Sequence, residues 1–377
     1  MIRAILLNPF LIISTSFSLS FLLYLLPFSE LYRPLTIENA LPFLYFVFLN
    51  IIASFFWNKF KVDFNVTCSL RVKKKVNILG YLVLMLVSIE LLIYGVPILG
   101  QVNYTDFGAP ILHVMLVSCL LILSIFSCFT YRDNKWWVFI SLIISLVILN
   151  RFLILFICIS GVITYISINK ISFKVYVRLF IGLILLVLFF GLLGNWRMSM
   201  IMDVPYEQAK KYILHAGNAS DYFKDTNLPV SFFWFWLYIT SPISNLILNV
   251  DLNTSANISN FINFISFELM PQTLSKHIGK YPFSILLISR NLNVSSAITP
   301  AYVSLGYLGI TIYFLYYSFI YFLVRFLTKG IMRCVIVVLF STLSSFMVFY
   351  NVIVMPIFIF SISVVFILSI SMKRKVS

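Results

Sequence analysis

Runs of about twenty apolar residues, repeated from one end of the chain to the other, constrain its fold more than any other feature. About 20 residues of helix cross a bilayer, and a helix satisfies its own backbone hydrogen bonds in lipid. The sequence therefore predicts an all-α polytopic membrane protein with about ten transmembrane helices, in which residues 1–377 form a single membrane domain. The expected helices are 4–26, 40–57, 77–97, 110–131, 136–150, 152–169, 176–194, 302–324, 334–350 and 353–371.

Composition excludes a soluble domain. Hydrophobic residues make up 61% of the chain and charged residues 10%, whereas about a quarter of the residues of a soluble domain are charged. The net charge of +15 would suit nucleic acid, but the long apolar runs cannot form a soluble surface. We therefore expect membrane lipids around the chain and no nucleic-acid partner.

Lysine and arginine collect in alternate segments between the expected helices. An N-terminus on the inside places the following cations there: Arg3, Lys59, Lys61, Arg71, Lys73, Lys74, Lys75, Arg132, Lys135, Lys170, Lys174, Arg178, Arg325, Lys329, Arg333, Lys373, Arg374 and Lys375. The short segments on the opposite side hold Arg33 and Arg151. Positively charged short segments remain in the cytoplasm during insertion, so both termini are expected to be cytoplasmic.

The mostly polar stretch 195–301, between the seventh and eighth expected helices, is predicted to be one large external, periplasmic loop. Within it, 231–250 is rich in aromatic residues. We expect a helix that lies flat at the membrane interface with aromatic side chains in the lipid, and a further crossing is the alternative. The side chains expected in lipid are Phe232, Phe233, Phe235 and Trp236.

Motifs for metal or nucleotide binding are missing from the sequence. It has no Cys-x-x-Cys, no His-Glu-x-x-His and no glycine-rich phosphate loop, and its three histidines are His113, His215 and His277. Such sites need these ligands at characteristic spacings. We expect neither a metal nor a cofactor.

Three arginines on the expected outer side are the candidate binding residues. Arg151 interrupts the apolar run ILNRFLIL, where a guanidinium at mid-bilayer would cost about 2.5–3.5 kcal/mol. Arg197 and Arg290 stand near the two ends of the polar stretch. Because a guanidinium grips phosphate oxygens with two parallel hydrogen bonds, these three residues suit the diphosphate of a polyprenyl substrate. The alternative is that Arg151 extends to lipid headgroups and the others are ordinary charges beside the membrane.

Other polar residues have several open roles. Glu90, inside an apolar helix, is expected to pair with Arg151, to act on substrate, or to pack as a neutral carboxyl, since burial raises a carboxyl pKa. His113, at an expected outer helix start, is assigned to interfacial packing. His277 and Glu268, in the polar stretch, are the candidate general bases.

Short motifs in the chain resemble bacterial O-antigen polymerases, the Wzy type of oligosaccharide repeat-unit polymerase. NVSSAITPAYVSLGYLGI, residues 293–310, is similar to the stretch that enters a late helix in that family, and WLYITSPI, residues 236–243, and LNRF, residues 149–152, are also similar. The family usually has Ser before that arginine and a small residue after it, where this chain has Asn150 and Phe152. The spacing from Arg290 to Gly306 also exceeds the family's usual arginine-to-glycine spacing.

The resemblance implies glycan polymerisation at the periplasmic face of the bacterial inner membrane. A growing glycan on undecaprenyl diphosphate would be transferred onto a new lipid-linked repeat unit. Arg151, Arg197 and Arg290 would stabilise the leaving diphosphate without a metal, and His277 or Glu268 would take the proton of the attacking hydroxyl. Expected partners are undecaprenyl-diphosphate-linked oligosaccharides, with a chain-length regulator and a flippase.

Three other functions remain open. An O-antigen ligase would have similar helices and arginines. A different polyprenyl-phosphate-dependent transferase would carry a catalytic acid in the first outer segment, at Glu30 or Glu38. A lipid-linked oligosaccharide flippase is the non-enzyme alternative, although transporters usually show repeated halves.

Overall fold

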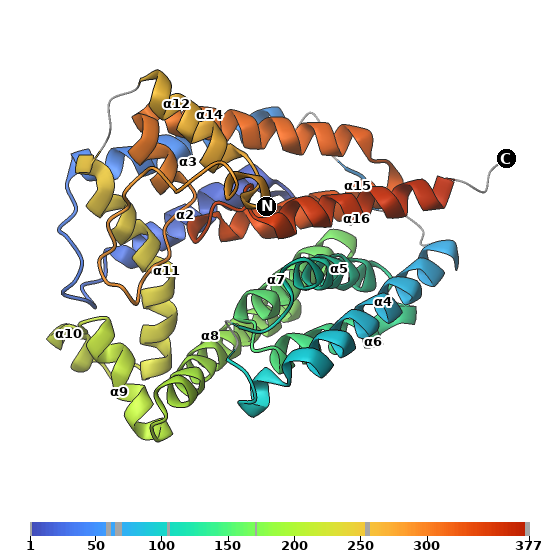
Figure 1. Ribbon diagram of the computed structural model, residues 1–377, viewed down its shortest axis with the longest axis horizontal. Helices are drawn as coiled ribbons and strands as arrows, with labels where there is room; N and C mark the ends of the chain where they lie inside the picture. Colours follow the sequence, from blue (N-terminus) through green and yellow to red (C-terminus); the bar gives the residue numbers. More distant parts are fainter. Residues whose placement is uncertain are drawn as a thin grey trace.

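The computed structural model describes residues 2–57, 62–64, 70–103, 106–169, 172–252 and 257–373. Within these ranges the regular secondary structure is helical (Figure 1), which confirms the all-α expectation for this part of the chain. Five cations expected on the inner side lie outside the described residues, namely Lys59, Lys61, Lys170, Arg374 and Lys375. Residues 253–256 of the polar stretch lie outside them as well.

Eight helices in the described ranges are long and apolar enough to cross a membrane. They are α3 (Ile37–Trp57), α4 (Leu70–Tyr94) continued by η2 (Pro97–Leu99), α5 (Pro110–Phe129), α7 (Arg151–Ile168), α8 (Phe173–Met202), α11 (Val230–Asn249), α14 (Ile298–Leu327), and α15 (Gly330–Ser345) continued by η5 (Phe346–Val348). Three shorter apolar helices are α2 (Pro9–Tyr24), which follows α1 (Ile2–Leu6), α6 (Tyr131–Val147) and α16 (Pro356–Lys373). Each segment predicted from the sequence overlaps one of these helices, and α11 is additional.

Basic residues share one end of the helical bundle. Arg3 donates a hydrogen bond to the carbonyl oxygen of Ser167 at 2.5 Å, and the Arg325 guanidinium lies 4.4 Å from the centre of the Trp57 ring. These contacts bring the chain's beginning, the end of α3, the end of α7 and the α14–α15 connection together. This end is called the basic end below.

The connection between α8 and α14 lies at the opposite end. Arg33, which follows α2, is 3.4 Å from Asp251, which follows α11. Asn351, which follows η5, donates to the backbone oxygen of Glu268 at 2.9 Å. The α2–α3 connection, the α15–α16 connection and the polar stretch therefore meet at the end of the bundle away from the basic end.

The polar stretch is largely helical. Helix α8 continues to Met202 and α14 begins at Ile298, so the connection is shorter at both ends than the expected 195–301. Besides α11 it contains α9 (Tyr206–Ala216), α10 (Asp221–Lys224), η3 (Val250–Leu252), α12 (Ile258–Phe264), the π-helix η4 (Ile265–Leu269) and α13 (Gln272–Ser275).

Helix α11 lies across the ends of other helices. In Figure 1 it runs from top to bottom, whereas α14, α15 and α16 run from left to right. Its contacts agree with this direction, because Ser20 near the end of α2 donates to the Ile239 carbonyl at 2.6 Å and Trp234 donates to Asn195 near the end of α8 at 2.6 Å. Helix α11 thus covers the end of the bundle that lies away from the basic residues. We call α11, together with α9 and α10, the roof.

Two aromatic residues of α11 expected in lipid are instead buried in protein. Phe233 and Trp236 are completely buried, and they pack with Phe28 of the α2–α3 connection and with Phe223 of α10. The Trp236 indole also donates to the Leu23 carbonyl at 2.8 Å. The expectation was wrong for these two because α9, α10 and the α2–α3 connection fold over this face of α11.

The candidate spans differ in how deeply they are buried. Among the candidate spans, α15 is the most buried and α8 the least. Helix α8 leaves large apolar side chains such as Phe180 and Leu185 exposed, and an apolar helix face of this kind is compatible with lipid.

Helix α14 bends inside the motif that carries the resemblance. Gly306 has φ 60° and ψ −140°, a conformation that side chains disfavour. A Cβ on Gly309 would lie 2.0 Å from the Ala301 carbonyl oxygen. The two glycines therefore allow α14 to turn sharply between its first turns and its long apolar part.

Candidate functional site

A cavity of about 670 Å³ opens between α7, α8, α11 and the segment 290–294. All three arginines that the sequence singled out, Arg151, Arg197 and Arg290, line it. They come from the start of α7, the end of α8 and the chain before α14. Among the described residues that line the cavity there is no Asp or Glu. The space is therefore strongly positive, and we call it the arginine cavity.

Backbone geometry places Arg151 at the start of α7. Leu149 adopts a left-handed conformation with φ 52°, which reverses the chain after α6. The Asn150 side chain then caps α7 by accepting from the Leu153 amide at 3.2 Å. Arg151 is the first residue of the helix, at the positive end of its dipole. A bound anion is stabilised at such a place.

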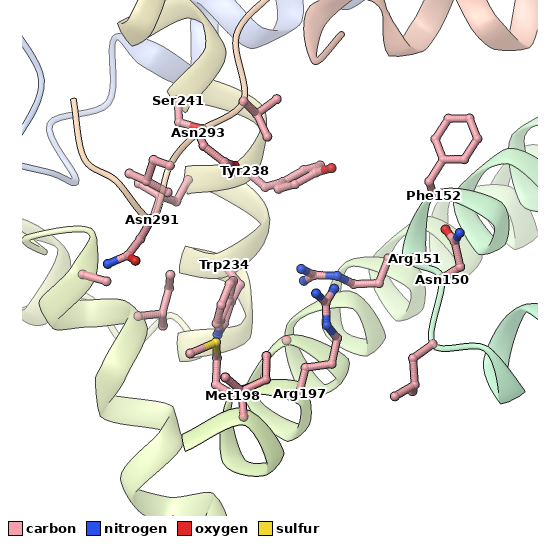
Figure 2. Close-up of a pocket in the computed structure, with 18 of the residues that line it drawn as sticks. Asn150, Arg151, Phe152, Arg197, Met198, Trp234, Tyr238, Ser241, Asn291 and Asn293 are labelled. Carbon is pink, nitrogen blue, oxygen red and sulfur yellow. The ribbon is translucent and has the colours of Figure 1, made fainter. Parts of the chain in front are cut away.

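Aromatic rings surround the Arg151 guanidinium. Its central carbon lies 4.8 Å from the Phe190 ring centre, 5.7 Å from Trp234 and 6.0 Å from Tyr238. A cation this close to a ring face gains about 0.5–1 kcal/mol at exposed sites. Figure 2 shows the side chains of Arg151 and Arg197 pointing into the space that faces Trp234 and Tyr238.

Close packing between α8 and α11 places Arg197. A Cβ on Gly191 would lie 2.3 Å from the Cα of Ser231, and one on Gly194 would lie 3.0 Å from the Trp234 ring. Small residues where two helices meet let their backbones approach this closely. This approach places the end of α8, which carries Arg197, against the first turns of α11.

Two asparagines hold the extended chain that carries Arg290. Asn245 donates to the carbonyls of Leu292 and Val294 at 2.9 and 2.7 Å and accepts from the Ile288 amide at 2.9 Å. Asn249, one turn later on α11, exchanges hydrogen bonds of 2.7 and 2.8 Å with the backbone of Leu286. Both side chains are completely buried. They replace the backbone partners that residues 286–294 would have in a sheet.

A pair of tyrosines borders the arginine cavity. The hydroxyl groups of Tyr238 and Tyr350 are 2.5 Å apart, and both residues line the space. Burial and the neighbouring Tyr238 raise the pKa of Tyr350, while the positive charges of Arg151 and Arg197 oppose the rise. Tyr350 thus lies within electrostatic range of both guanidinium groups.

Glu268 and His277, the expected bases, do not line the arginine cavity. Glu268 is buried in η4, accepts from the Tyr281 hydroxyl at 2.7 Å and accepts from Asn351 at 3.1 Å. Burial raises the pKa of Glu268, and these two hydrogen bonds oppose the rise. His277 is exposed at the surface. The carboxyl of Glu268 thus ties η4 to the α15–α16 connection.

A histidine and a carboxylate that the sequence did not pair are in contact. His113 Nδ1 lies 3.0 Å from Glu90 Oε2, and His113 lines the arginine cavity. Glu90 therefore pairs with His113. A pair with Arg151 was one of the roles that the sequence left open, and the structure does not form it. A carboxylate inside an apolar helix and a histidine at a helix start are both visible in the sequence. Their contact depends on how α4 and α5 pack.

An apolar groove lies beside the arginine cavity. It has a volume of about 600 Å³ and is lined by residues that include Leu192, Leu193 and Trp196 of α8. Leu193 also borders a narrow apolar space that reaches Arg151. Helix α8, the least buried candidate span, thus lies between the arginine cavity and the apolar groove.

The acids expected in the alternative transferase lie away from the arginine cavity. Glu30 and Glu38 are exposed, and neither lines the arginine cavity.

In the described part of the chain, no three His, Cys, Asp or Glu side chains gather closely enough to hold a metal ion.

Comparison with known protein families, with curated protein sequences and with solved structures finds no match.

Proposed function

We propose that this protein is a membrane glycosyltransferase that polymerises undecaprenyl-diphosphate-linked repeat units, the activity of the O-antigen polymerases that its motifs resemble. One observation carries the proposal. Three arginines that lie far apart in the sequence, Arg151, Arg197 and Arg290, line one cavity together with aromatic rings. Arginines gathered in this way suit a ligand with several phosphate oxygens.

The chemistry of the arginine cavity fits a diphosphate that leaves. Breaking the bond between a sugar's anomeric carbon and the diphosphate oxygen puts further negative charge on that oxygen. Fixed positive groups that surround this developing charge lower the barrier. The guanidinium of Arg151 and the start of α7 face the same space, so the side-chain charge and the helix dipole act together.

The apolar groove beside α8 suits the lipid part of such a substrate. A polyprenyl chain needs an apolar path that begins close to its diphosphate. The groove and the narrow space that leads to Arg151 share Leu193. A lipid tail would lie against α8 while its diphosphate enters the arginine cavity.

Charge distribution supports an orientation for the reaction. Cations near short connections mark the cytoplasmic side, so the basic end of the bundle is assigned to the cytoplasm together with both termini. The arginine cavity would then open at the outer face of the bacterial inner membrane. Lipid-linked repeat units would reach it after a flippase, and a chain-length regulator would act on the same side.

A deletion strain tests the proposal through the surface glycan that it makes. We expect a deletion to leave lipopolysaccharide that carries one repeat unit, visible on a gel as a core-plus-one band. Wild-type protein should restore the long ladder. Arg290→Ala should be inserted in normal amount and leave the single-unit band, because the diphosphate clamp loses one charge.

Arg33→Ala is the matched control, since Arg33 is an exposed arginine at the same end of the bundle and pairs with Asp251. It should restore a normal ladder. A ladder of normal length from Arg290→Ala would contradict the clamp. A deletion strain with core alone would instead indicate a ligase or a flippase.

A further inference from the structure

The pair formed by His113 and Glu90 is the strongest polar feature that the proposed clamp does not use. Glu90 is completely buried, and the His113 side chain is 25% exposed. Among the described residues, His113 is the hydrogen-bond partner of Glu90, whose other carboxylate oxygen has none. A buried carboxylate in an apolar helix is costly. Such a group persists where a specific partner or a function requires it.

The contact with Glu90 determines which ring nitrogen of His113 is left for a ligand. Nδ1 faces the carboxyl group at 3.0 Å, so with Glu90 ionised and the ring neutral, Nδ1 carries the hydrogen and donates it to Glu90. Nε2 then holds the free electron pair. A carboxylate behind a histidine fixes the ring's tautomer and orientation in this way in many catalytic sites.

Neighbouring residues also hold the imidazole in place. The rings of Phe107 and His113 pack edge to face, with 5.9 Å between their centres. Gly108 has φ 98°, and a Cβ there would lie 2.6 Å from His113 Nδ1. The backbone can therefore pass this close to the ring only with glycine at position 108. Phe107 and His113 both line the arginine cavity.

We propose that His113 is the general base that takes the proton from the acceptor hydroxyl, and that Glu90 is its positioning residue. This inference rests on the proposed glycosyl transfer. It follows from the shared cavity, because His113 opens into the space lined by Arg151, Arg197 and Arg290. Glu268 and His277 have no such access.

The proposed step forms one bond to the anomeric carbon and breaks another. The acceptor hydroxyl oxygen forms a bond to the anomeric carbon of the donor glycan, and its proton passes to Nε2 of His113. The bond from that carbon to the diphosphate oxygen breaks, and its electron pair leaves with the lipid diphosphate, whose charge the arginines hold. The imidazolium, stabilised by Glu90, then releases its proton to external water.

The test uses the full chain, purified in lipid nanodiscs with lipid-linked repeat units as substrate. Two quantities are measured, namely kcat for glycan transfer and the Kd for undecaprenyl diphosphate. General bases contribute about 10²–10⁴-fold to rate, so we expect His113→Gln to lower kcat by at least about 100-fold with an unchanged Kd. His215→Gln, at an exposed histidine of α9 outside the cavity, should match the wild type.

Glu90 variants separate positioning from folding. Glu90→Gln should lower kcat without changing the Kd, and Glu90→Asp should recover part of the rate. If His113→Gln proves unstable because Glu90 is left buried without a partner, the double variant with Glu90→Gln removes that charge. It should be stable, bind undecaprenyl diphosphate normally and remain inactive.

The two proposals fail in different ways. A kcat for His113→Gln within about threefold of the wild type would overturn the assignment of the base and leave the clamp standing. An unchanged Kd for undecaprenyl diphosphate in Arg290→Ala would overturn the proposed function itself.

Discussion

Arg151 shows how a single residue can be both costly and useful at its position. A cation at the first position of a helix faces the positive end of the helix dipole, and Leu149, two residues earlier, adopts a left-handed backbone. Aromatic rings and an open cavity offset part of this cost. An anionic ligand would offset more, because it binds the guanidinium and the helix start together.

Arg151→Lys tests whether the shape of the charged group matters as well as its charge. An ammonium keeps the positive charge but loses the paired, parallel hydrogen bonds of a guanidinium. Charged hydrogen bonds contribute about 1.5–3 kcal/mol each, so we expect Arg151→Lys to weaken binding of undecaprenyl diphosphate by about ten-fold or more. Titration of the purified protein measures this. Equal affinity in Arg151→Lys and the wild type would show that charge alone suffices.

The raised pKa of Glu268 predicts that the stability of the folded protein depends on pH. Burial raises its pKa in the folded protein, whereas in the unfolded chain it is near the usual value of about 4.3. The protonated form therefore favours folding, and its contribution is present below the unfolded pKa and lost as the pH rises through the folded pKa. We expect the Tm of the wild type to fall as the pH rises above about 4.3.

Glu268→Gln removes this titration, so its Tm should change less over the same pH range. In that variant the side-chain amide oxygen would still accept from Tyr281. The amide nitrogen would replace the oxygen that accepts from Asn351 at 3.1 Å, so that hydrogen bond is lost, while Asn351 can still donate to the backbone oxygen of residue 268. Thermal unfolding in one detergent at a series of pH values measures the difference. Parallel pH curves for the two proteins would exclude Glu268 as the source.

At the scale of elements, the contact between α8 and α11 determines the shape of the arginine cavity. Gly191 and Gly194 let α11 approach α8, and α11 in turn holds the chain that carries Arg290 through Asn245 and Asn249. One helix contact thus positions groups from three parts of the chain. A change at this contact should affect the arginine cavity without touching an arginine.

Gly191→Ala should lower both stability and glycan transfer, because its Cβ would lie 2.3 Å from the Cα of Ser231 and the helices must separate. Gly182→Ala is the matched control on the same helix, since a Cβ there meets no atom within 4 Å. It should be neutral or stabilise by up to about 1 kcal/mol through helix propensity. Tm and ladder length measure both variants. A Gly191→Ala protein as stable and active as Gly182→Ala would contradict the proposed helix contact.

At the scale of the whole molecule, the bundle has a basic end and an end that carries the roof and the arginine cavity. The roof is itself folded, because α9 and α10 pack on α11 and on the α2–α3 connection. A helix as apolar as α11 could cross a membrane by length and composition. Its contacts with the ends of α2 and α8 instead fit a helix that lies across the end of the bundle.

Labelling of single cysteines, introduced into a variant without the native ones, measures this orientation in whole cells. We expect Lys211→Cys on α9, an exposed position of the roof, to react with a membrane-impermeant maleimide added from outside. Lys74→Cys on α4, near the basic end, should react only after the membrane is broken. The reverse pattern would place the arginine cavity in the cytoplasm and exclude polymerisation at the outer face.

The sequence by itself determined where the apolar helices lie, because an apolar run of this length has few other ways to satisfy its backbone in lipid. It also pointed to Arg151, Arg197 and Arg290, since charge beside long apolar runs is conspicuous. The structure decided that these three line one cavity, that Glu90 contacts His113, and that Phe233 and Trp236 are buried in protein. Each of these facts joins residues distant along the chain, and local periodicity carries no information about such contacts. They arise from which helix faces pack, which depends on small residues such as Gly191 and on buried hydrogen bonds such as those of Asn245.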